Sequence, residues 1–167
     1  MGRFPIQADL NRRSDADHEA KCRRCGISCH LALPVGGSTA MMVVPELHCR
    51  FLARMDDGWG CTVYDERFER APWCHHADDA APIGLLARDC PHVVEAGIKR
   101  GKVVLREPLL SQYWPRMMAA IAQLGVPIHI DRDAFVAEVT RREGRPHELV
   151  AWPGDPERLR LVPVEAP

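Results

Sequence analysis

Cysteine is the residue type whose number and spacing in this sequence point most directly to chemistry. The chain has seven cysteines among 167 residues: Cys22, Cys25, Cys29, Cys49, Cys61, Cys74 and Cys90. An odd set cannot pair completely within one chain, and the N-terminal residues show no apolar segment typical of a secretory signal. We therefore expect a cytoplasmic protein whose cysteines are metal ligands or redox groups rather than a disulfide framework.

The first three cysteines form a compact motif. Cys22 and Cys25 are separated by two residues, a spacing that lets two thiolates bind one ion. Gly26 permits the tight turn that must follow such a pair. Cys29 lies within the next turn of chain and is a candidate third ligand of the same centre.

Histidines gather around the cysteines. Five of the eight histidines lie within two residues of a cysteine, and His30, His75 and His76 are candidate ligands. The patch Cys74-His75-His76 is interpreted either as an open coordination site able to hold water or substrate, or as a solvated loop with one imidazole ligand. Adjacent side chains of an extended segment point to opposite sides, so at most one of the two histidines is expected to face the same ion as Cys74.

The cysteine motifs resemble a known family. The segment Cys22-x-x-Cys25-Gly26-Ile27-Ser28-Cys29 resembles the C-x-x-C-G-x-C-C opening of the YkgJ-type cysteine-cluster proteins, which are described as zinc- or iron-chelating domains. Residues 48–52, 60–67 and 72–74 look like later cysteine segments of that family, and the resemblance covers about residues 21–96. It implies a bound metal. Ser28 and Phe68 stand where the family has cysteine and proline, and His30 is a candidate replacement for the missing ligand.

The ligand count favours zinc. Seven thiolates and one histidine make eight ligands, enough for a four-cysteine site and a three-cysteine-one-histidine site. A thiolate-bridged zinc pair, or one iron–sulfur cluster on four cysteines, would use the same residues. We expect zinc because the ligands are dispersed along the chain from Cys22 to Cys90 and would tie loops together. Iron or an iron–sulfur cluster is the alternative, kept open by the closely spaced first three cysteines.

The chain divides by composition into three segments, which must position these ligands. Residues 1–20 are polar and predict an N-terminal arm. Residues 21–96 have only short apolar stretches and predict an irregular, cysteine-rich module organised by metal, with a turn between two strands at residues 56–58. Residues 97–167 predict a small α+β extension, so the expected fold class is α+β.

Local patterns predict the elements of the extension. Apolar spacing predicts a helix over residues 115–124 with Pro115 in its first turn, and a second helix capped by Asp131 with Phe135 and Val139 facing inward. Apolar and alternating stretches predict strands near residues 102–105, 126–130, 147–152 and 158–164.

Composition excludes several classes of function. The chain has 22 basic and 23 acidic residues, and this net charge of −1 gives no reason to expect a nucleic-acid or anionic-membrane partner. The motifs of nucleotide-binding loops, serine hydrolases and zinc proteases do not occur. We expect a metal-binding accessory or binding protein whose partners are a metal ion and another protein. The alternatives are a metal-dependent or iron–sulfur redox or radical-type enzyme with an open site near Cys74-His75-His76, and a metal-transfer or thiol-redox protein.

Overall fold

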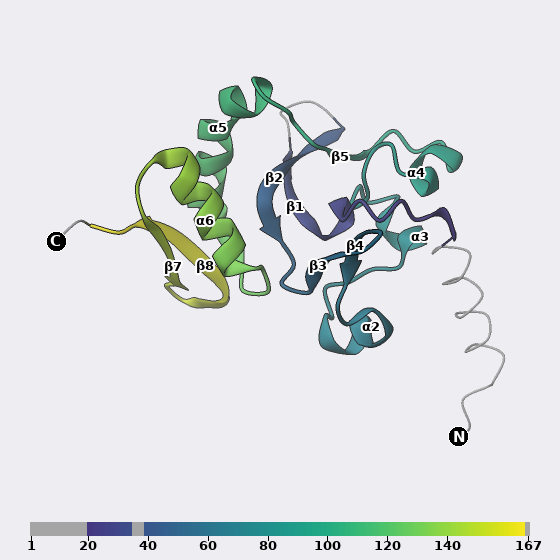
Figure 1. The fold of residues 1–167 in the computed structure, drawn as a ribbon, viewed down its shortest axis with the longest axis horizontal. Helices are drawn as coiled ribbons and strands as arrows, with labels where there is room; N and C mark the ends of the chain where they lie inside the picture. Colours follow the sequence, from purple (N-terminus) through teal and green to yellow (C-terminus); the bar gives the residue numbers. More distant parts are fainter. Residues whose placement is uncertain (1–19, 35–38, 166–167) are drawn as a thin grey trace.

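The computed structural model describes residues 20–34 and 39–165 and shows an α+β fold, as predicted (Figure 1). Residues 1–19 of the predicted N-terminal arm lie outside the described part of the chain. Within residues 20–34 and 39–165, three small sheets contain the strands, and two long helices lie together at one end of the molecule. None of the helices in the described ranges combines the length and apolar character needed to cross a bilayer.

The central sheet is built around its longest strand. β1 (His30–Pro34) pairs antiparallel with β2 (Ala40–His48), and β5 (Gly101–Val103) pairs parallel with β2 on its other side. Val44 and Leu47 of β2 are fully buried. The strand lies in the interior of the protein. Its nearly continuous run of apolar residues favours this burial.

The second sheet is the hairpin of β3 (Leu52–Met55) and β4 (Gly58–Cys61), with the predicted turn at its tip. Gly58 has φ of 135°, a conformation that favours glycine, and a Cβ atom at this position would lie 2.7 Å from the carbonyl oxygen of Arg24. The next residue, Trp59, donates its backbone N–H to the same carbonyl (N···O 2.8 Å). The hairpin is thereby joined to the segment that bears the first cysteines.

The other elements between residues 20 and 96 are single turns. They are η1 (Ile27–Cys29), η2 (Tyr64–Glu66), α2 (Arg67–Arg70), α3 (Ala77–Ala80) and α4 (Pro91–Glu95). A small apolar cluster that includes Ala80, Leu86 and Val93 packs around α3 and α4. Elements this short bury little apolar surface of their own.

The C-terminal elements are regular. They are α5 (Leu109–Leu124), β6 (Val126–Pro127), α6 (Arg132–Glu143), β7 (His147–Trp152) and β8 (Asp155–Pro163). The three strands form an antiparallel sheet in the order β6-β8-β7. The predicted cap of α6 is confirmed, because a side-chain oxygen of Asp131 accepts the backbone N–H of Ala134 (3.0 Å). Phe135 and Val139 are buried, as expected.

Two predicted boundaries in this region were wrong. The helix predicted over residues 115–124 begins at Leu109, so Pro115 lies inside it. Buried Leu110 and Trp114 hold the earlier turns against the core, and this packing outweighs the backbone hydrogen bond that a proline removes. The strand predicted over residues 126–130 ends at Pro127.

One apolar core joins β2 to the C-terminal elements. Met42, Val44 and Leu47 of β2 share this core with residues of α5, α6, β6 and β8. Its largest fully buried side chain is Phe135 of α6, a helix that contacts β2 directly. The core therefore extends across residue 96, the expected end of the cysteine-rich segment.

Candidate metal centre

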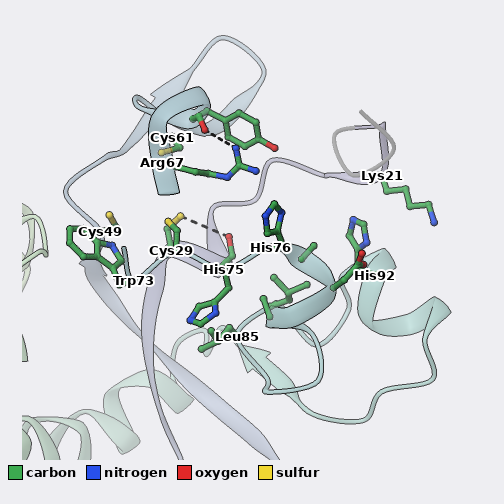
Figure 2. Close-up of a pocket in the computed structure, with 17 residues that line it drawn as sticks. Lys21, Cys29, Cys49, Cys61, Arg67, Trp73, His75, His76, Leu85 and His92 are labelled. Carbon is green, nitrogen blue, oxygen red and sulfur yellow. Dashed lines mark hydrogen bonds between the residues drawn. The ribbon is translucent and has the colours of Figure 1, made fainter. Parts of the chain in front are cut away.

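Four of the seven cysteines line one cavity of about 450 Å³ (Figure 2). Cys29 ends η1, Cys49 follows β2, Cys61 ends β4, and Cys74 lies in the loop after α2. Thiol groups from four separate segments of chain thus face a common space.

Backbone hydrogen bonds fix the positions of these segments. Cys49 donates its N–H to the carbonyl of Cys29 (2.9 Å), and its own carbonyl accepts the N–H of Leu52 (3.0 Å). Leu52 is the partner of Cys61 across the β3–β4 hairpin. Cys74 donates its N–H to the carbonyl of Ala71 (2.8 Å). Backbone pairing therefore sets the places from which the four side chains reach the cavity.

The electrostatics of this group disfavour bare thiolates. Burial, with smaller contributions from the nearby Cys49, Cys74 and Cys61, raises the pKa of Cys29 to about 12 against a lowering contribution from the hydrogen bond of Ser28. Burial also raises the pKa of Cys74, and Cys49 and Cys61 again add to the effect. Neighbouring negative charges in a poorly solvated space repel one another. A bound cation would relieve this repulsion by displacing the protons.

A buried lysine braces the loop that holds Cys29. Lys102 of β5 is 5% exposed, and its ammonium donates to the carbonyls of Ile27 (3.4 Å), Ser28 (2.8 Å) and His30 (2.6 Å). Burial lowers the pKa of Lys102 to about 8, while the charge of Cys29 acts in the opposite direction. The lysine thus places positive charge next to the thiol cavity.

Within the described residues, Cys22, Cys25 and Cys90 do not line this cavity, and we call these three cysteines the second group. Cys25 and Cys90 interact electrostatically with Arg23, and Cys25 lines a different pocket from the one lined by Cys29. Arg23 pairs with Asp89 (2.8 Å). This ion pair joins the first cysteine motif to the segment that contains Cys90. The sequence motif suggested one centre for the first three cysteines, whereas Cys25 and Cys29 face different spaces.

Two cysteines of the second group accept backbone hydrogen bonds. The sulfur of Cys22 accepts the N–H of Arg24 (3.4 Å), and Arg24 has φ of 49°, which is uncommon outside glycine. Burial raises the pKa of Cys90, while the backbone N–H groups of His92 and Val93 hydrogen-bond to its sulfur and lower it. Backbone N–H groups directed at sulfur stabilise a thiolate.

The three predicted histidine ligands lie in different surroundings. His75 and His76 both line the cavity with Cys74 (Figure 2), although only one of them was expected to face its ion. His30 lies beside His48, with ring centroids 5.1 Å apart, and its Nδ1 atom is 3.0 Å from the carbonyl oxygen of Gly26. Burial lowers the pKa of His30. His30 is not among the side chains that line the cavity in the described ranges.

Other residues of the cavity wall were not among the candidate site residues predicted from the sequence. Trp73 stacks on His129 with ring centroids 4.0 Å apart, and its buried indole N–H has no hydrogen-bond partner within the described residues. Arg67 and His92 also line the wall. Arg67 and Trp73 lie in the family-like segments 60–67 and 72–74, and His92 lies two residues after Cys90, but these patterns indicate the neighbouring cysteines and not the wall residues. They reach the cavity through the folding of distant segments, which local spacing does not encode.

In their present conformations, the candidate ligand side chains of the described residues do not form a complete metal site. Within residues 20–34 and 39–165, no three Cys, His, Asp or Glu side chains come together in a group that could hold a metal ion. Comparison of the chain with models of protein families, with curated proteins and with solved structures gives no match. The resemblance to the YkgJ-type family thus stays a prediction from the motifs.

Proposed function

We propose that the protein is a metal-binding accessory or binding protein in which thiolate-bound zinc has a mainly structural role. One observation supports this most strongly: Cys29, Cys49, Cys61 and Cys74 line one cavity although they come from four separate segments. Four thiolates around Zn²⁺ are a common structural arrangement. Because each sulfur moves on rotation about a single side-chain bond, small rotations toward a shared ion could complete the site.

The surroundings of the four thiols suit such a centre. Four thiolates and one divalent ion have a net charge of −2, and the ammonium of Lys102 lies beside the loop of Cys29. The buried indole N–H of Trp73 needs an acceptor, and a thiolate sulfur can supply one. The short elements around the cavity bury little apolar surface, so a metal crosslink would contribute to their stability.

The second cysteine group would hold a second ion. Cys22, Cys25 and Cys90 lie where an ion pair joins two distant segments, and the sulfurs of Cys22 and Cys90 accept backbone N–H groups. This division corresponds to one four-cysteine site and one site with three cysteines. We further propose a cytoplasmic location, since reduced thiols persist there.

A second candidate function is a redox or radical-type enzyme that uses iron or an iron–sulfur cluster. The cavity supports this alternative, because its volume exceeds that of a single ion and His75 and His76 lie on its wall next to Cys74. Four thiolates are also the ligands of iron–sulfur clusters. The colour and the metal content of the purified protein separate the two candidates.

Loss of one cysteine from each group tests the proposal. We expect the wild-type protein to retain two zinc ions per chain after gel filtration, and Cys61→Ser and Cys25→Ser each to retain one, as measured by mass spectrometry of the metal. Ser28→Ala is the matched control, because Ser28 lines the cavity beside Cys29 but is not a proposed ligand. Equal zinc content in Cys61→Ser and the wild type would contradict the assignment of the four-cysteine site.

A further inference from the structure

A second pocket, of about 860 Å³, lies beside β5, and we call it the β5 pocket. Lys102 and Val103 of that strand line it, together with side chains from the segment of Cys25, from α4 and from the chain after β5. Its volume is in the range of binding sites. Among its lining residues in the described part of the chain, only Cys25 is a proposed zinc ligand. The metal therefore leaves most of this wall without a role.

Solvent-exposed aliphatic side chains line the β5 pocket. Val94 of α4 is 62% exposed, more than any other large apolar side chain in the described ranges, and Val104 is 53% exposed. Ile27 and Val103 also line the pocket and are partly buried. Exposed apolar side chains that gather at a depression with a polar rim are typical of an interaction site.

Two arginines of the same wall have no acidic partner. Arg88 and Arg106 are exposed, and neither guanidinium has an ion pair or a hydrogen bond within residues 20–34 and 39–165. Asp89 is the one carboxylate among the lining side chains that the structure describes. Arg23 occupies both of its oxygens, with Nη1 3.1 Å from Oδ2 and Nη2 2.8 Å from Oδ1. The wall therefore has a net positive charge.

The acidic side chains that follow wall residues in the sequence do not compensate this charge. Glu95 pairs with Lys21, and Glu107 pairs with Arg142 (2.9 Å). The segment 98–106, which contains β5, has four basic residues and no acidic one. The charge of the two wall arginines is thus available to a partner molecule.

The combination of aliphatic side chains and unpaired guanidinium groups favours an acidic peptide segment as the partner. A guanidinium binds a carboxylate with two parallel hydrogen bonds, and aliphatic side chains of a peptide would cover the exposed valines. Single-stranded nucleic acid is also negatively charged, but its bases stack on aromatic side chains. No aromatic side chain of the described residues lines this pocket.

We propose that the β5 pocket is the docking site for a short segment of a partner protein that combines aliphatic and acidic side chains. Its aliphatic side chains would contact Val94 and Val104, and its carboxylates would pair with Arg88 and Arg106. This inference rests on the proposed role as a binding protein and names the chemistry of the partner. It does not require the partner to contact a metal ion.

Fluorescence anisotropy of a short, labelled peptide of alternating glutamate and leucine tests the inference on the full-length, zinc-loaded protein. We expect this peptide to bind the wild type. The same peptide with glutamine in place of glutamate should bind at least about tenfold more weakly, because charge-assisted hydrogen bonds are lost. A version with serine in place of leucine should weaken binding by about the same factor, because apolar contact is lost.

A pair of double variants tests the location of the site. The combination of Arg88→Gln and Arg106→Gln should weaken binding of the glutamate–leucine peptide by at least about tenfold. The combination of Lys99→Gln and Arg100→Gln is the matched control. It removes the same charge from exposed positions that, in the described ranges, do not line the pocket. Circular dichroism of both variants checks that they are folded.

Four results would overturn the inference: no binding of the glutamate–leucine peptide, equal binding of either substituted peptide, equal affinities in the two double variants, or binding of a single-stranded oligouridylate at least as tight as that of the peptide. The comparisons between peptides use wild-type protein, so they decide the matter even if a variant does not fold. Zinc content is measured on the same samples. Zinc-loaded wild type that does not bind the peptide contradicts this inference alone, whereas peptide binding by a protein without any metal contradicts the proposed zinc function alone.

Discussion

At the scale of single residues, the environment of Cys29 links the thiol cavity to the central sheet. Cys29 shares a backbone hydrogen bond with Cys49, while Lys102 of β5 donates to the carbonyls on both sides of Cys29. The ammonium is almost fully buried, so it has exchanged hydration for these carbonyl contacts. One side chain of the sheet therefore fixes the loop from which Cys29 reaches the cavity.

Replacement of this lysine should cost both stability and metal affinity. Lys102→Met leaves the carbonyls of Ile27, Ser28 and His30 without their shared donor, and we expect a loss of about 1–3 kcal/mol in the free energy of unfolding. Zinc should also bind more weakly, because a positive charge near the thiolates is removed. Urea unfolding and competition with a chelator measure the two effects. Lys99→Met, at an exposed position, is the control, and equal stability of the two variants would contradict the role of Lys102.

The identities of the candidate ligands could be predicted from the sequence, whereas their grouping could not. Cysteine count and spacing are local properties. The division into two groups depends on the turn at Gly26, where φ is 71°, after which Cys29 faces a different space from Cys25. Lys102 has no motif to identify it, because its role arises from the packing of distant segments.

At the scale of elements, local signals predicted α6 well and nonlocal pairing poorly. Asp131 caps the helix and Gly144 ends it, and both effects act within a few residues of chain. β5 pairs with β2, about 60 residues earlier in the chain, which local patterns cannot anticipate. The start of α5 was predicted too late, at Pro115, because a proline usually occurs in the first turn of a helix. Buried Trp114 keeps the preceding turns helical, and the sequence pattern does not show this contact.

An ion-pair network on α6 should make its contribution to stability depend on pH. Glu138 accepts hydrogen bonds from Arg141 (2.8 Å) and Arg142 (2.6 Å), and its side chain is 11% exposed. Burial acts to raise the pKa of Glu138, but the bonds from both arginines outweigh it and lower the pKa below its ordinary value. The stabilisation is therefore complete above the ordinary carboxyl pKa of about 4.5 and is lost as the pH falls through the lower folded value.

Glu138→Gln tests this dependence. At pH 7 we expect the variant to be less stable than the wild type by about 1–3 kcal/mol in urea unfolding, because charge-assisted bonds of a mostly buried carboxylate are lost. The difference should shrink as the pH is lowered below about 4.5. Glu148→Gln, at an exposed position of β7, should show no such change. A constant difference between Glu138→Gln and the wild type at all pH values would contradict the assignment.

At the scale of the whole molecule, the cysteine-bearing segment and the C-terminal elements share one core. β2 places apolar side chains in that core, and Cys49, which follows β2 directly, forms a β-bridge with buried Ile130. Constraints applied at the thiol cavity are thus transmitted to the core through the backbone. We expect a bound metal to stabilise the entire fold rather than a separate module.

The central claim is that thiolate-bound zinc completes this fold, and metal analysis of anaerobically purified wild-type protein tests it most directly. The measurement combines elemental analysis with an absorbance spectrum of the same sample. The proposed function predicts two zinc ions per chain and no absorbance in the visible range. A protein purified without bound metal, or a brown protein containing iron and sulfide, would contradict it.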